Sequence, residues 1–251
     1  MKKRRTLYRT AADLYYFILT AVRLRVRKAA PVFIYTMGKV GSSSIRDSLK
    51  RYYPGVVASG HSFKPLWKST AQVKAIYHWY HKRDTEEINI ISLVREPVAR
   101  NMSIFFQEYQ KSNGFTGNET AEDLLELFVH HPTDPVTWFD RKLKPVFDID
   151  VYRYDFSDYA VIRRGRVNLL LMKSELNDKE KSEIIRDFLG MEELAITRTN
   201  ESRVRKYSGI YDAFKKIKIP VEYVEKLYAS PYCKHFYKDI TVQDQIEKWC
   251  V

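Results

Sequence analysis

The chain has 251 residues, of which 45% are hydrophobic and 14% aromatic, and it carries a net charge of +12 at neutral pH. This hydrophobic and aromatic content is sufficient for a packed core and excludes an intrinsically disordered chain. The two cysteines, Cys233 and Cys250, lack a CxxC spacing, which argues against a zinc site and favours reduced thiols in a cytoplasmic protein. No repeat or low-complexity linker divides the sequence, so we expect one domain over residues 31–251 after an N-terminal helix over residues 1–30.

The positive charge is concentrated at the N-terminus. Residues 1–28 contain nine Lys and Arg residues and one acidic residue, Asp13, so they carry +8 of the total. Their least polar run, residues 11–22, is shorter than the roughly 20 residues that a membrane-spanning helix needs, and no signal-peptide cleavage pattern follows it. We therefore predict a basic amphipathic helix that either lies on an anionic membrane surface, such as the inner face of the plasma membrane, or packs on the domain. No recognition motif for nucleic acid accompanies the charge, which disfavours a nucleic-acid partner.

A buried strand, a loop of small residues and a helix are predicted between Pro31 and Lys50. Val32–Tyr35 is an apolar, β-favouring run, and the sequence GKVGSSS follows it before the helix. Such a turn points backbone N–H groups and the positive end of a helix dipole at one place, which suits an anion. The candidate residues for a phosphate-like group are Gly38, Lys39, Val40, Gly41, Ser42, Ser43 and Ser44. An ordinary Gly- and Ser-rich turn is the alternative.

The next predicted elements are a short strand over residues 56–58 and a helix over residues 70–82. Gly60 and His61 follow the end of the strand. Because ligands bind outside the carboxyl ends of the strands in open α/β sheets, His61 is a candidate site residue. A role as a loop or capping residue is the alternative.

A second strand-to-helix junction is predicted between Ile88 and Phe106. A buried strand ends at Arg95, and Pro97 suits the first turn of the following helix. Arg95 and Ser103 are eight positions apart. Arg95 suits a phosphate because its planar guanidinium can hold two phosphate oxygens at once, and Arg100 is a weaker candidate.

The two junctions resemble motifs of sulfotransferases that use 3′-phosphoadenosine 5′-phosphosulfate (PAPS). That family has a P-K-x-G-[ST]-[ST] loop and an R-x-P-x-x-R-x-x-S motif, and here Met37 and Gly38 before Lys39 are a mild departure. In a Walker-type loop the lysine follows the last glycine, whereas Lys39 precedes Gly41. Among sulfotransferases the chain is most similar to the bacterial capsular polysaccharide synthesis family, which is related to Golgi carbohydrate sulfotransferases. The specific motifs cover residues 31–110.

This resemblance implies a P-loop NTPase-like three-layer α/β sandwich with a central parallel sheet and a helical C-terminal part. It implies transfer of a sulfuryl group from PAPS to a hydroxyl of a carbohydrate, such as a polysaccharide or glycolipid, with no metal required. Residues 38–44 would bind the 5′-phosphosulfate, with Lys39 catalytic. Arg95 and Ser103 would bind the 3′-phosphate, and His61 would be the general base.

Further helices are predicted over residues 119–130 and 178–189, a buried strand over residues 167–172, and a pair of helices between residues 220 and 237. Residues 147–156 are expected to include a strand or an extended segment, and residues 163–166 a charged turn. Arg203, Arg205 and Lys206 are candidate donors to the nucleotide or to an acidic acceptor, or belong to the start of a charged helix.

Two other functions stay open from the sequence. A P-loop kinase acting on a small molecule would need a Walker-type lysine and a magnesium-binding aspartate after a strand, and neither pattern is evident. A non-catalytic, membrane-associated protein of polysaccharide assembly would bind a membrane through residues 1–28 and would not bind the nucleotide.

Overall fold

The computed structural model describes residues 2–65, 69–131, 136–197 and 207–251, and in residues 2–10 only the backbone. The described chain is a mixed α/β structure with one five-stranded, mostly parallel sheet and eleven α-helices, which confirms the expected class. It divides into two compact units. Unit 1 comprises Met1–Met37, Gly41–Val94 and Asp158–Thr199, and unit 2 comprises Gly38–Val40, Arg95–Ser157 and Asn200–Val251. The expectation of a single domain over residues 31–251 stays a prediction.

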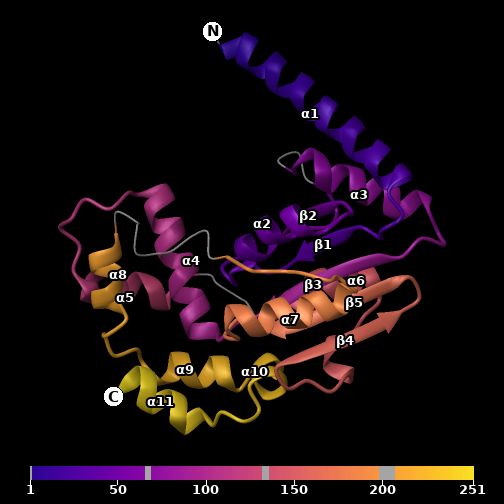
Figure 1. Ribbon diagram of the computed structural model, residues 1–251. Helices are drawn as coiled ribbons and strands as arrows, with labels where there is room; N and C mark the ends of the chain where they lie inside the picture. Colours follow the sequence, from indigo (N-terminus) through magenta and orange to yellow (C-terminus); the bar gives the residue numbers. More distant parts are fainter. Residues whose placement is uncertain (1, 66–68, 132–135, 198–206) are drawn as a thin grey trace. The chain divides into compact units, whose positions relative to one another are not determined.

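Unit 1 contains the sheet, in the strand order β2-β1-β3-β5-β4 (Figure 1). The strands are β1 (Val32–Tyr35), β2 (Val57–Gly60), β3 (Ile88–Val94), β4 (Tyr159–Arg164) and β5 (Val167–Lys173). The pairs β1–β2, β1–β3 and β3–β5 are parallel, and β4 joins β5 as an antiparallel edge strand. Every residue of β1 and nearly every residue of β3 is buried, because central parallel strands are covered on both faces.

Four helices complete unit 1. They are α1 (Lys2–Val26), α2 (Ser42–Tyr52), α3 (Ala71–Lys82) and α7 (Asp178–Leu189). Helix α1 lies along α3 (Figure 1). Beneath α3, Phe63 packs edge-on against Phe33 and Tyr80 at ring-centroid distances of 5.3 Å each, so an aromatic cluster fixes the segment that follows β2.

Unit 2 is helical. Its helices are α4 (Pro97–Ser112), α5 (Ala121–Val129), the π-helix η1 (Phe139–Leu143), α6 (Lys144–Phe147), the 3₁₀-helix η2 (Val151–Arg153), α8 (Ser208–Phe214), α9 (Val221–Tyr228), α10 (Pro231–Phe236) and α11 (Val242–Cys250). Phe105 and Phe106 of α4, Phe128 of α5 and Phe214 of α8 form its aromatic core, with ring centroids 5.1–6.2 Å apart in the contacting pairs. The helical C-terminal part was expected.

Residues 147–156 contain the end of α6 and the 3₁₀-helix η2. Of the two alternatives expected there, no residue lies in a strand, whereas Asp150 and Tyr154 on either side of η2 are extended. One local expectation was wrong. Residues 163 and 164 belong to β4, and the turn is confined to Gly165, whose φ is +55°, and Arg166. The hairpin places the basic run of residues 163–166 partly in the sheet because β5 supplies the backbone hydrogen bonds.

Candidate functional site

Three of the predicted site segments begin where neighbouring parallel strands of the sheet end. Strands β2, β1 and β3 are adjacent, and Tyr35 pairs with Gly60 at the carboxyl ends of β1 and β2. His61 follows β2, the GKVGSSS loop follows β1 after two residues, and Arg95 follows β3 directly. Each of these segments therefore follows the carboxyl end of its own strand, and open α/β folds bind ligands outside the carboxyl ends of their strands.

The loop after β1 has an unusual backbone. Lys39 has a φ of +71° and Gly41 a φ of +81°, so two residues adopt the left-handed conformation within three positions. Glycine adopts it readily, whereas for a residue with a Cβ atom it is uncommon and costs about 1 kcal/mol or more. A strained backbone persists only where the surrounding structure holds it in place. Strain of this kind is typical of functional loops.

The loop residues Gly41 to Ser44 begin helix α2 in unit 1. Gly41 is the N-cap residue and, having no side chain, it makes no side-chain hydrogen bond to the N–H groups of the first turn. Ser42, Ser43 and Ser44 form that turn and are half-buried. A helix start of this kind presents backbone donors and the positive end of the dipole, which is the arrangement expected for an anion.

In unit 2, two arginines hold the backbone of the other loop residues. Arg95 donates from Nη1 to the carbonyl oxygen of Lys39 at 2.6 Å, and Arg100 donates from Nε to the carbonyl oxygen of Gly38 at 3.1 Å. The two predicted motifs, which are 56 positions apart in sequence, are therefore in direct contact. The contact of Arg95 uses one of the five N–H donors of its guanidinium.

Arg100 has a larger role than the sequence indicated. It is buried, at 7% exposure, and its Nη1 lies 3.2 Å from Oδ1 of the fully buried Asn101, which in turn donates to the hydroxyl of Tyr223 at 2.9 Å. Burial lowers the pKa of the Arg100 guanidinium from its ordinary value. A charged side chain is retained away from water only where it is paired or hydrogen-bonded. Here the hydrogen bond from Arg100 to the Gly38 carbonyl fixes the position of Gly38.

Tyr232 holds the backbone of Arg95. Its hydroxyl accepts from the Arg95 N–H and donates to the Arg95 carbonyl, both at 2.9 Å. The tyrosine is fully buried and lies 137 positions from the arginine, so no local sequence pattern predicts this contact. Helix α10 thereby positions the residue that was predicted to bind the 3′-phosphate.

Glu96 completes the support of this junction. Its carboxylate caps α4 by accepting from the N–H groups of Val98 and Ala99, both at 2.8 Å, and it accepts from the hydroxyl of Tyr228 at 2.6 Å. Burial raises the pKa of the Glu96 carboxyl, although these hydrogen bonds act in the opposite direction. Glu96 therefore fixes the start of α4, and Tyr232 fixes the backbone of Arg95 next to it.

The ring of His61 is oriented by a backbone carbonyl in unit 1. Its Nδ1 lies 2.7 Å from the carbonyl oxygen of Thr36, the residue that follows β1. Because a carbonyl can only accept, Nδ1 carries the proton in the neutral ring, and Nε2 carries the lone pair. His61 is exposed, so Nε2 of this tautomer has the character that a general base requires.

Ser103 is half-buried on α4, and no hydrogen bond among the described contacts joins it to Arg95. Arg203, Arg205 and Lys206 lie outside the described residues. In the part of the chain that the structure covers, no three His, Cys, Asp or Glu side chains are grouped as a metal site would require. The roles assigned to the individual residues stay predictions.

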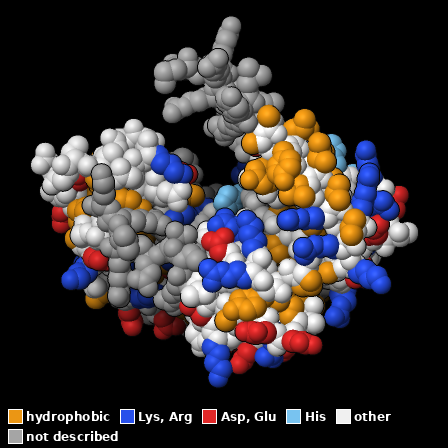
Figure 2. Space-filling model, turned by 45° about the horizontal axis from the view of Figure 1, so that its top comes forward, with side chains coloured by type: hydrophobic (Ala, Val, Ile, Leu, Met, Phe, Trp, Pro, Cys, Tyr) orange, Lys and Arg blue, Asp and Glu red, His pale blue; other side chains and the backbone are white. Residues whose placement is uncertain are grey.

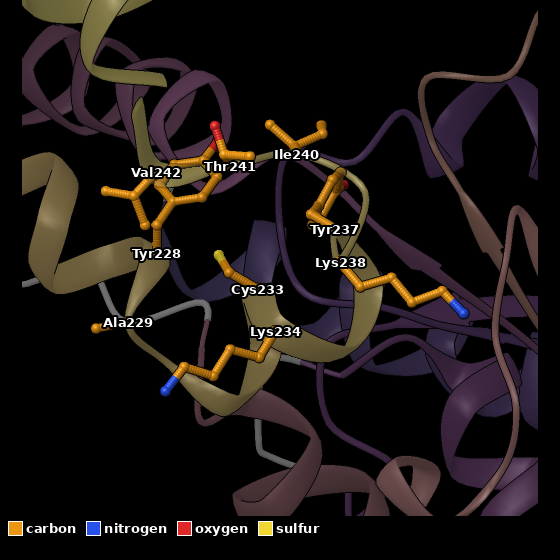
Figure 3. A pocket seen from close by; sticks show the side chains of 9 residues that line it. All are labelled: Tyr228, Ala229, Cys233, Lys234, Tyr237, Lys238, Ile240, Thr241 and Val242. Carbon is orange, nitrogen blue, oxygen red and sulfur yellow. The ribbon is translucent and has the colours of Figure 1, made fainter. Parts of the chain in front are cut away.

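A pocket of about 430 Å³ lies elsewhere in unit 2 (Figure 3). It is lined by Tyr228, Ala229, Cys233, Lys234, Tyr237, Lys238, Ile240, Thr241 and Val242, and none of the predicted site residues is among them. Burial raises the pKa of the Cys233 thiol to about 12, so the thiol is neutral and a poor nucleophile. The amino groups of Lys234 and Lys238 point away from this thiol in Figure 3, and we assign the pocket no role.

Comparison with known proteins gives one match. A family model described as "Putative capsular polysaccharide synthesis protein" matches residues 114–238, close to half of the chain. No curated protein and no solved structure matches. The matched range includes Tyr223, Tyr228 and Tyr232, but not the loop, His61, Arg95 or Ser103. The second half of this chain is therefore similar to a family named for the synthesis of capsular polysaccharide.

Proposed function

We propose that the chain is a sulfotransferase of polysaccharide synthesis, which moves a sulfuryl group from PAPS to a hydroxyl of a carbohydrate or glycolipid. The family match supports the coarser part of this proposal, a biosynthetic role in capsular polysaccharide synthesis. The observation that carries the finer part is the hydrogen bond between Arg95 and the Lys39 carbonyl, because it joins the two motifs that resemble the phosphosulfate and 3′-phosphate motifs of sulfotransferases. On this proposal the sheet is of the P-loop NTPase type.

The proposed reaction is an in-line displacement at sulfur. The oxygen of the acceptor hydroxyl forms a bond to sulfur while the bond from sulfur to the bridging phosphate oxygen breaks. The acceptor gives its proton to Nε2 of His61, and the products are a sulfate ester and adenosine 3′,5′-bisphosphate. Negative charge develops on the phosphate oxygen that leaves, so fixed donors at that oxygen lower the barrier.

The loop and the second motif would bind different groups of PAPS. The ammonium of Lys39 and the N–H groups of residues 41–44 would stabilise the 5′-phosphosulfate and the developing charge. The guanidinium of Arg95, with Ser103, would bind the 3′-phosphate and so place the sulfur for attack. Arg100 and Tyr232 are positioning residues, since they hold the backbone of Gly38 and of Arg95.

Titration of the purified protein with nucleotides tests the proposal. We expect micromolar binding of adenosine 3′,5′-bisphosphate by calorimetry in the absence of Mg²⁺, and binding at least tenfold weaker for adenosine 5′-monophosphate, which lacks the 3′-phosphate. Preferential binding of ATP with Mg²⁺ would instead support a kinase. Absence of binding to any of these nucleotides would support a non-catalytic role in polysaccharide assembly.

Replacement of His61 by glutamine tests the general base. Glutamine retains an N–H donor for the Thr36 carbonyl but has no basic nitrogen, so we expect sulfuryl transfer from PAPS to fall about 100-fold. His130→Gln, at the C-cap position of α5, is the matched control. Near wild-type transfer by a folded His61→Gln protein would exclude His61 as the base.

A further inference from the structure

Helix α1 has one face that packs and one that does not. Thr20 and Leu24 are buried, and the ring of Phe17 contacts His78 of α3 edge-on at 5.9 Å. These three residues are spaced three and four positions apart, so they lie on the side of α1 that faces α3. This packing was one of the two expectations for the N-terminal helix.

The opposite face of α1 carries exposed apolar residues, with Arg25 toward its C-terminal end. Leu14, Ile18, Val22 and Val26 recur every four residues, and their exposures are 59%, 52%, 49% and 75%. Figure 2 shows hydrophobic side chains gathered on the part of α1 next to the grey end of the chain. We call Leu14, Ile18, Val22 and Val26 the α1 stripe. Large exposed apolar surfaces on one helix face are typical of a docking site rather than of surface that stays in water.

The charge around the α1 stripe is strongly positive. Residues 1–28 contain nine basic residues, and the single acidic one, Asp13, lies at the helical position of the face that packs on α3. Arg23, Arg25 and Arg27 are exposed at the C-terminal end of the stripe, while Lys2, Lys3, Arg4 and Arg5 belong to the other end of the sequence of α1. Both ends of the helix are therefore basic.

This charge distribution selects among possible occupants of the stripe. A second copy of the chain would bring basic ends together in either orientation of two α1 helices, which opposes their association. A nucleic acid would match the charge but offers no apolar surface to the stripe. Among the described helices none is long and apolar enough to cross a membrane. A helix with an exposed apolar stripe and basic ends suits the plane of a bilayer surface that carries anionic lipids.

We infer that α1 docks on a bilayer rich in anionic lipids, with the α1 stripe among the acyl chains and the basic residues at the headgroups. Amphipathic helices of this composition bind through the sum of buried apolar area and attraction to anionic lipids. Neither the buried apolar area nor the attraction to anionic lipids depends on the proposed sulfotransferase activity, so the inference can be tested independently of that activity. A surface of this kind would keep the protein beside lipid-linked acceptors.

Vesicle co-sedimentation of the full chain tests the inference. We expect binding to vesicles of phosphatidylcholine with 30% phosphatidylglycerol, and binding at least tenfold weaker to phosphatidylcholine alone. Ile18→Asp should weaken binding at least tenfold, because it places a charge within the stripe. The matched control is Leu127→Asp on α5, since Leu127 is 51% exposed and Ile18 52%. Both sites are exposed, and thermal unfolding would verify that the variants remain folded.

A charge variant separates the electrostatic contribution. Replacement of Arg23, Arg25 and Arg27 by glutamine leaves the stripe intact and should weaken binding to the anionic vesicles about 100-fold, with a much smaller effect on neutral ones. Equal binding to both vesicles, or equal binding of Ile18→Asp and Leu127→Asp, would overturn the inference. Concentration-dependent dimerisation that Ile18→Asp abolishes would show that a second copy covers the stripe, and would overturn it too.

Discussion

Replacement of Lys39 by alanine is expected to reduce sulfuryl transfer about 1000-fold while the protein remains folded. In the proposed reaction Lys39 donates to the phosphate oxygen that becomes negative as the bond to sulfur breaks. Loss of one fixed donor to such an oxygen costs about 4 kcal/mol at the upper end of the usual range, which corresponds to three orders of magnitude. The prediction concerns turnover, because the developing charge exists only in the transition state.

The geometry of the loop allows Lys39→Ala to remove the side-chain charge without changing the backbone contacts. The contact between Arg95 and residue 39 uses the backbone carbonyl, which alanine retains. Both lysine and alanine carry a Cβ atom, so the left-handed φ of +71° at this position costs them a similar free energy. The variant therefore removes the ammonium and leaves the loop backbone in place.

The measurement is transfer of radiolabelled sulfate from PAPS to an acceptor polysaccharide found by screening, at saturating PAPS. Lys50→Ala removes an exposed lysine from the last turn of the same helix that the loop begins, and it should retain full activity. Adenosine 3′,5′-bisphosphate should still bind Lys39→Ala, since the 3′-phosphate has other partners. Near wild-type turnover in a folded Lys39→Ala protein would remove Lys39 from the mechanism.

The parts of the fold that sequence predicted are those with strong local signals. Strand β1 is wholly apolar or aromatic, and β3 and β5 are mostly apolar, because both faces of these strands are covered, and this leaves little ambiguity. Pro97 and Gly190 mark the first residue of α4 and the end of α7. The α/β class and the two strand-to-helix junctions followed from these signals.

The elements that were missed depend on contacts distant in sequence or on weak patterns. In β4 only Ile162 is buried, so its sequence lacks the alternation of a half-buried strand, and pairing with β5 is what makes it a strand. Helix α11 has a local signal at its start, the capping box of Thr241 and Asp244.

The candidate site shows the same division. Its loop and Arg95 could be found from sequence because each motif is local. Tyr232 could not be found, because a tyrosine that bonds to the backbone of Arg95 leaves no motif at either position. Arg100 was undervalued because the burial of an arginine on a helix depends on how the helix packs, and the sequence alone does not give that packing.

Replacement of Arg95 by alanine is expected to weaken binding of adenosine 3′,5′-bisphosphate about 200-fold. A bidentate, charge-assisted contact between a guanidinium and a phosphate has two strong hydrogen bonds, and its loss costs about 3 kcal/mol. Calorimetric titration measures the effect directly. Arg153→Ala is the matched control in unit 2, because the Arg153 side chain is 81% exposed and its ion pair with Asp150 is long, at 3.4 Å.

A second ligand distinguishes phosphate binding from a structural role. Arg95 also donates to the Lys39 carbonyl, so its loss could disturb the loop and weaken any nucleotide. Adenosine 5′-phosphosulfate has the loop-binding group of PAPS without the 3′-phosphate, and we expect Arg95→Ala to change its affinity by less than threefold. The losses of binding free energy caused by Arg95→Ala and by removal of the 3′-phosphate should then be strongly non-additive, as expected for two groups in direct contact. Equal losses for the two ligands would mean that Arg95 only supports the loop, and the 3′-phosphate would need another partner.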